Sequence, residues 1–310
     1  MFKKIMAKIG VGSAKIDLIL PQSAYMMGDT VAGELVIQGG AVDQSINKID
    51  IDFIIQIHTS KQIHQQVIQK IPFPEAFTIH ASERKALPFS FTIPQDVLVS
   101  GSKVSYLFKT NLDIAGGIDS GDHDPIQILP PKRLDHLISA FEELGFRESH
   151  DSRSFDGYTQ EFEFFPTSFL RGQVNEVEFA AALEEDQIRV LLELDLPAFG
   201  REVEIRKELS LPNDLLDDIP RLVHYLRDQM EEMVNHPESY RHVRSSLRHG
   251  YGQHPRSGFA GAMGGMVAGF LGGIIMAELL EETIEGFEEA AFGGEEEESF
   301  FDDMFGGGDE

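Results

Sequence analysis

The chain contains no cysteine in its 310 residues. Without thiols it can form neither a disulfide framework nor a thiolate metal site, and it has no cysteine nucleophile. This composition agrees with a reducing cytosol. The N-terminus has the basic start of a signal peptide, but Lys8 and Lys15 interrupt the apolar core that export requires. The sequence therefore predicts a cytoplasmic protein without an export signal.

Basic residues are scarce, at 26 Lys and Arg against 52 Asp and Glu, which gives a formal net charge of −26. Residues 278–310 supply 14 of the acidic side chains and no Lys or Arg, so residues 1–277 carry −12. Affinity for a nucleic-acid duplex depends on cationic groups that neutralise phosphates. Nucleic acid is therefore not expected as a partner.

The familiar catalytic motifs are missing from the sequence. It has no Gly-x-Gly-x-x-Gly after a strand, no P-loop, no Gly-x-Ser-x-Gly and no kinase set, and no two histidines have the His-x-x-x-His spacing of a zinc site. Carboxylate pairs that meet only in space stay open as an alternative. Four glutamates alternate along expected strands, which favours an outward-facing set over a catalytic pair: Glu161, Glu163, Glu176 and Glu178. We expect no catalytic residue, cofactor or metal.

Four aspartates lie close to a group of glycines and suggest a calcium loop: Asp113, Asp119, Asp122 and Asp124, around Gly116, Gly117 and Gly121. The segment lacks the alternate-position oxygens and terminal Glu of an EF-type loop, because Ile118 and His123 do not fit that pattern. Turn chemistry at a β-hairpin is the interpretation we prefer.

Strand-like alternation dominates residues 13–130. Seven strands are expected, at 14–20, 32–37, 46–59, 62–71, 87–93, 104–114 and 125–129. The third shows the alternation best, with one face formed by Ile49, Ile51, Phe53, Ile55 and Ile57. Short strands with turns between them and no intervening helix are typical of an antiparallel β-sandwich.

The period changes after Pro130 and Pro131. Residues 132–146 show the 3.6-residue period of an amphipathic helix, and a polar loop is expected at 145–156. Strands are expected again at 160–165, 173–183, 187–194 and 203–211. A second apolar stripe begins after Pro212 and contains Pro220, which predicts a kinked helix or two helices.

The length favours two domains and a tail, since one domain usually has about 100–200 residues. We divide the chain into a sandwich at 1–131, a helix and linker at 132–156, a second β-rich, α+β domain at 157–239, a basic linker at 240–256, an apolar glycine-rich segment at 257–277 and an acidic tail at 278–310.

The glycine-rich segment has 21 residues without a charge, and its glycines at four-residue spacing would share one face of a helix as a glycine zipper: Gly261, Gly265, Gly269 and Gly273. Three interpretations stay open: a helix that packs on itself or on a partner in a soluble protein, a membrane segment, and disorder. The basic linker before it is either a contact for anionic lipid or a solvated connection.

The acidic tail interleaves carboxylates with large apolar residues: Phe300, Phe301, Met304 and Phe305. Such a segment can fold onto a basic, hydrophobic groove as a recognition motif. The alternative is a tail that only adds solubility.

Several stretches resemble the SpoOM family of sporulation-control proteins. They are FKKI at 2–5, GDTVAGELVIQGG at 28–40, FDGYTQEFEFFP at 155–166 and VNEVEF at 174–179. The resemblance covers most of residues 1–235. It implies an arrestin-like N-terminal domain and a regulatory role in sporulation control, and it brings no agreed active site.

These observations favour a mainly β, arrestin-like regulatory or adaptor protein that acts by binding protein partners, with self-association through the glycine-rich helix as one route. A membrane-associated scaffold anchored by residues 257–277 is the alternative from another class. An enzyme is the third hypothesis, and it predicts a deep polar pocket with converging titratable groups between the domains.

Overall fold

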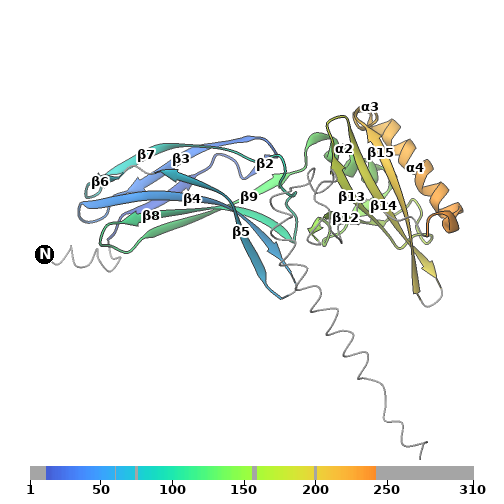
Figure 1. Ribbon diagram of the computed structural model, residues 1–310, viewed down its shortest axis with the longest axis horizontal. Coiled ribbons are helices and arrows are strands. Elements are labelled where there is room, and N and C mark those ends of the chain that lie inside the picture. Colours follow the sequence, from blue (N-terminus) through green and yellow to red (C-terminus); the bar gives the residue numbers. More distant parts are fainter. Residues whose placement is uncertain (1–11, 60, 74–75, 156–158, 199–200, 242–310) are drawn as a thin grey trace, which may run out of the picture.

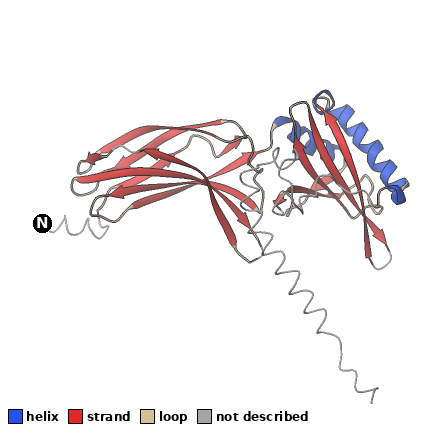
Figure 2. Cartoon of the chain, in the orientation of Figure 1, coloured by secondary structure: helices blue, strands red, loops and turns tan. Residues whose placement is uncertain are grey.

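The computed structural model describes residues 12–59, 61–73, 76–155, 159–198 and 201–241. The described chain is mainly β, as the sequence predicts, and forms two parts that lie side by side (Figure 1). Among the described residues, the N-terminal part is built from strands, whereas the second part combines strands with helices (Figure 2).

The N-terminal part is a sandwich of two sheets. One has the order β1-β3-β7 and the other β2-β9-β8-β4-β5, with β6 also paired to β4. All these pairs are antiparallel except β2 with β9, which is parallel. The strands are β1 (Lys15–Ile19), β2 (Ala24–Met26), β3 (Thr30–Gln38), β4 (Gln44–His58), β5 (Ile63–Phe73), β6 (Phe77–Ile79), β7 (Arg84–Thr92), β8 (Val104–Ile114) and β9 (Ser120–Leu129).

The seven expected strands are all present, while β2 and β6 were missed. Each of the two has three residues, which is too short for a period to be read. Strand β9 begins at Ser120, five residues earlier than expected. The prediction missed its first half because Asp122 and Asp124 stand at inward positions, where the alternation of a strand leads one to expect apolar side chains.

Alternation places the core of the sandwich between its sheets. The expected apolar face of β4 is confirmed, since its five side chains are each at most 1% exposed. At the centre, the ring of Phe53 lies 5.0 Å from that of Phe91 and 5.2 Å from that of Phe108. Aromatic pairs at such distances add stability beyond the area they bury.

The second part opens with the expected helix α2 (Lys132–Leu144), which ends at Gly145 with a left-handed φ of 95°. The prediction of a polar loop at 145–156 is partly wrong, because this segment contains the short strands β10 (Phe146–Glu148) and β11 (Ser154–Phe155). Each of the two strands has one buried Phe. The remaining strands are β12 (Gln160–Pro166), β13 (Glu176–Leu183), β14 (Gln187–Ala198) and β15 (Arg201–Pro212), in a sheet of order β10-β12-β13-β14-β15 with β11 paired to β12.

The break expected near Pro220 is confirmed as two helices, α3 (Asn213–Leu216) and α4 (Ile219–Asn235), followed by the short 3₁₀ helix η1 (Pro237–Ser239). Pro220 lies in the first turn of α4, where a missing N–H costs little, and the Asp218 side chain accepts a hydrogen bond from Arg221 N. Helices α2 and α4 cover one face of the second sheet and complete its core (Figure 1).

Candidate functional site

The joint between the two parts is built from exchanged side chains. Val99, in the segment that leads to β8, lies in the core of the second part, and Phe155 of β11 lies in the core of the sandwich. The side chain of Gln160 is fully buried beside them. It accepts a hydrogen bond from Val99 N at 2.8 Å and donates to the carbonyls of Val99 at 2.8 Å and Arg153 at 2.9 Å. One amide therefore ties the backbones of both parts together.

Arg153 adds a second tie across the joint. Its guanidinium donates to Ser100 O at 3.1 Å and forms an ion pair with Glu148 at 2.7 Å. A further ion pair joins Lys103 of the sandwich to Asp151 at 3.2 Å. The orientation of the two parts is thus set by specific polar contacts as well as by the exchanged apolar residues.

A groove of about 960 Å³ runs along the joint and takes its lining from both parts. Two of its carboxylates have basic partners, since Asp217 contacts Arg133 within the groove at 3.0 Å and Glu184 accepts a hydrogen bond from Arg189 at 2.6 Å. The hydrogen bond from Arg133 lowers the pKa of Asp217, and hydrogen bonds from Gln187 and Arg189 lower the pKa of Glu184. Neither carboxylate is suited to proton transfer near neutral pH.

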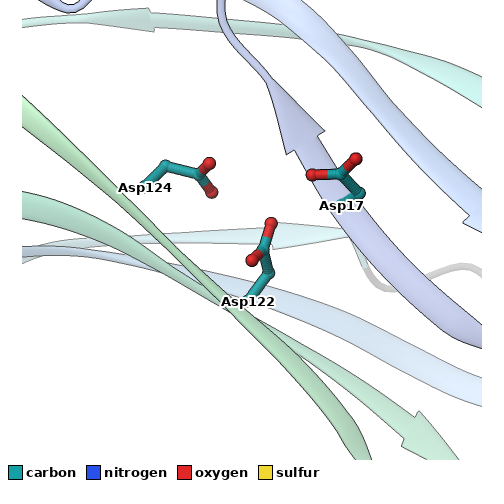
Figure 3. Close-up of side chains that lie close together, drawn as sticks. All are labelled: Asp17, Asp122 and Asp124. Carbon is teal, nitrogen blue, oxygen red and sulfur yellow. The ribbon is translucent and has the colours of Figure 1, made fainter.

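Three aspartates converge where strand β1 meets strand β9, at an edge of the sandwich (Figure 3). Asp17 comes from β1, while Asp122 and Asp124 lie two positions apart on β9, and their carboxylate oxygens lie within 4.8 Å of one another. Asp122 also accepts a hydrogen bond from Leu18 N at 3.1 Å. Burial, followed by the neighbouring Asp122 and Asp17, raises the pKa of Asp124 to about 7.

The face of the second sheet opposite α2 and α4 is also acidic. Glu163, Glu178 and Glu193 lie directly opposite one another across three strands, and Arg206 is the next residue in that row. Arg206 forms an ion pair with Glu193 at 2.7 Å. The four expected glutamates therefore share the outer face, although each is only half-exposed.

Strand β5 ends the larger sheet of the sandwich and pairs with β4. It has 11 residues, among which Val67 and Ile68 are half-exposed and Ile63 is 53% exposed. A long edge strand of this kind offers main-chain groups to an added strand. Lys70 and Pro72 near its end are the kind of residue that blocks such pairing, so the accessible stretch is the first half of the strand.

The four aspartates that the sequence suggested do not form one cluster. Asp119 accepts a hydrogen bond from Ile114 N at 3.0 Å, which confirms turn chemistry at the β8–β9 hairpin, and Asp113 accepts one from Asn47. Only Asp122 and Asp124 come together, and Asp17, their third neighbour, was missed because it lies far away in sequence. The available signal was two aspartates at inward positions of a strand.

The glycine face and the aromatic positions of the tail lie outside the described residues, and both stay predictions. They are Gly261, Gly265, Gly269 and Gly273, and Phe300, Phe301, Met304 and Phe305. Within the described ranges, every helix is too short or too polar to cross a membrane.

A family model described as SpoOM protein matches residues 2–198. The chain belongs to the SpoOM family. The family expected from the sequence motifs is thus confirmed. This SpoOM-family chain is 35% identical over 211 residues to the sporulation-control protein spo0M of Bacillus subtilis (strain 168). The aligned residues make up 64% of this chain and 82% of the relative. It also matches the crystal structure of Spo0M, a sporulation control protein from Bacillus subtilis, with a TM-score of 0.55 and 30% identity over 73% of this chain and 99% of that one.

Proposed function

We propose that this chain is a non-enzymatic regulator of sporulation control that binds protein partners by adding a strand to the edge of its sandwich. Membership of the SpoOM family supports the regulatory role in sporulation. The strand-addition mechanism rests on one observation, the accessible edge of β5. Main-chain hydrogen bonds would supply affinity, and half-exposed side chains such as Val67 and Ile68 would supply specificity.

The chemistry of the groove supports binding over catalysis. A catalytic acid or base works best with a pKa near the operating pH, whereas the pKa values of Asp217 and Glu184 are lowered by their hydrogen-bonding partners. Arg133, the cation nearest to Asp217 in the groove, is held in the same ion pair. These two carboxylates of the groove are thus ionised and ion-paired, which suits a polar contact with another macromolecule.

Two adjacent proline substitutions test the edge of β5. Consecutive residues of a strand direct their N–H groups to opposite sides. Of the two single variants, Gln65→Pro and Gln66→Pro, one therefore loses an N–H that points to β4 and the other loses an N–H that points outward. Partners are first captured from spore-forming cells with the full-length protein and identified by mass spectrometry. Binding of each purified partner to the two variants is then measured by calorimetry.

We expect the variant with the nearly unchanged melting temperature to lose the partner, because its proline blocks only the outer edge. The other variant should melt earlier, because it loses a hydrogen bond to β4. A partner that binds both variants as tightly as the wild type would exclude β5 as the contact. A purified protein that turns over a metabolite would exclude the non-enzymatic role itself.

A further inference from the structure

The inner face of β9 changes character along the strand. Ile126 and Ile128 fill the core between the sheets, whereas Asp124 and Asp122, the preceding inward positions, are half-buried carboxylates. Asp17 joins them from the edge of β1. Within the described residues, no ion pair connects any of the three to a Lys or Arg. Three like charges therefore share a partly desolvated site without a basic partner, which is costly unless a cation or protons neutralise them.

A fourth oxygen beside the aspartates is buried and unsatisfied. Thr110 on β8 is 0% exposed, and its hydroxyl has no hydrogen-bond partner among the described residues. Thr110 lies directly opposite Asp122 in the antiparallel β8–β9 pair, so both side chains leave the same face of the sheet at neighbouring positions. One carboxylate oxygen of Asp124 is also buried without a partner. Buried polar atoms are nearly always paired, so one unsatisfied atom within the carboxylate cluster and another on the neighbouring strand indicate a missing ligand.

We propose that Asp17, Asp122 and Asp124 bind a hard divalent cation, with calcium as the best match and the Thr110 hydroxyl as a fourth ligand. Calcium takes six to eight oxygens at about 2.3–2.6 Å, so two oxygens on opposite sides of the ion are separated by about 4.8 Å. The carboxylate oxygens of the three aspartates lie within that limit. Asp17 is exposed, which gives the ion access from solvent and leaves room for water ligands.

Calcium fits the donors better than the softer metals do. Carboxylate and hydroxyl oxygens suit magnesium, calcium and manganese, and the chain has no cysteine to favour zinc through sulfur. Magnesium requires a nearly ideal octahedron, whereas calcium tolerates ligands that two different sheets supply. Because β1 and β9 belong to different sheets, the ion would fasten the sandwich at the edge where Asp122 already holds Leu18 N.

The other carboxylate clusters of the described chain lack this combination. Glu193, Asp195 and Glu204 have a cation of their own in Arg206, which contacts both glutamates. Glu163, Glu176 and Glu178 have no buried orphan atom beside them. The cluster of Glu163, Glu176 and Glu178 is thus a matched control within the same protein, because it has three carboxylates and none of the unsatisfied buried atoms found among the described residues.

The test is calcium titration of the full-length, chelator-treated protein at physiological salt, by calorimetry and by thermal melting. We expect one site per chain and a melting temperature that rises with calcium concentration, more strongly than with magnesium. Asp124→Asn should weaken binding at least about tenfold, as removal of a charged ligand does in oxygen-based sites. Glu178→Gln should leave it unchanged. Calcium that binds weakly to the acidic tail would contribute equally in every variant, so the difference between variants is the readout.

Thr110→Val separates the ligand role from a structural one. Valine has nearly the same shape but no hydroxyl, so the calcium-free variant should melt at the same temperature or higher, because an unsatisfied buried polar group is removed. Its calcium affinity should nevertheless fall several-fold. Equal calcium affinity in the wild type and Asp124→Asn, or a melting temperature that calcium does not raise, would overturn the site and leave a cluster that holds protons only.

Discussion

Tyr106 illustrates at the scale of one residue how the sandwich core accommodates a polar group. The side chain is 1% exposed, its ring stacks on Phe53 at 5.6 Å, and its hydroxyl donates a hydrogen bond to Leu98 O at 2.8 Å. Burial raises the pKa of Tyr106, so the phenol stays protonated and remains a donor. The hydrogen bond holds the segment before β8 that continues to Val99 at the joint.

Tyr106→Phe should therefore lower the free energy of unfolding by about 1–2 kcal/mol, because the Leu98 carbonyl loses its donor where water cannot replace it. Urea unfolding measures this loss. Tyr25→Phe is the matched control, since the Tyr25 hydroxyl donates at 2.9 Å to the carbonyl of Gln22, an exposed residue at which water can replace the donor. Its loss should be smaller, and equal losses in the two variants would contradict the argument.

At the scale of the element, the second sheet carries its acids in cross-strand rows. Like charges that lie directly opposite one another destabilise an antiparallel strand pair. In this sheet Glu178 lies opposite Glu163 on one neighbouring strand and opposite Glu193 on the other. Burial, followed by Glu161 and Glu193, raises the pKa of Glu178 to about 7. Burial, followed by Glu163, raises the pKa of Glu176 to about 8.

These shifts predict a protein that is more stable in mild acid. Because both pKa values are raised, the folded state keeps protons that the unfolded state has already lost. The resulting stability is fully present below the ordinary pKa of 4.5 and is lost as the pH rises through about 7 to 8. The melting temperature should fall between about pH 5 and pH 9.

Glu178→Gln should flatten this pH dependence and raise the melting temperature above about pH 8, by about 2–4 °C for each kcal/mol of repulsion removed. Glu142→Gln, at an exposed position of α2, should retain the wild-type profile. Scanning calorimetry across the pH range measures both variants. A Glu178→Gln profile as steep as that of the wild type would show that the rows of acids do not control it.

The elements themselves were largely predictable, because most of them repeat a period over several turns or pleats. The alternation in β4 and the apolar stripe of α2 each extend over more than ten residues, so chance matches are few. Strands β2 and β6 lack that length. The Asp17, Asp122 and Asp124 cluster was not predictable, because it depends on which strand of the opposite sheet lies beside β9, and no local pattern encodes that pairing.

At the scale of the whole molecule, the buried amide of Gln160 sets how the two parts sit together. It satisfies three backbone groups, at Val99 and Arg153, that would otherwise be buried without partners. Each unsatisfied group of this kind costs about 1–3 kcal/mol. The apolar exchange of Val99 and Phe155 gives affinity between the parts, whereas the amide fixes their orientation.

Gln160→Leu should uncouple the two parts, because leucine can neither donate to Val99 O nor accept from Val99 N. We expect the wild type to unfold in one calorimetric transition and Gln160→Leu in two, and we expect the substitution to increase the radius of gyration from small-angle X-ray scattering. Gln173→Leu, at an exposed position of the second part, should change neither quantity. Gln160→Glu keeps an acceptor for Val99 N but loses the donor, so an intermediate separation is expected. One transition and an unchanged radius of gyration in Gln160→Leu would mean that the exchanged side chains of Val99 and Phe155 are enough to hold the two parts together. The groove along the joint would then keep its shape without the Gln160 amide.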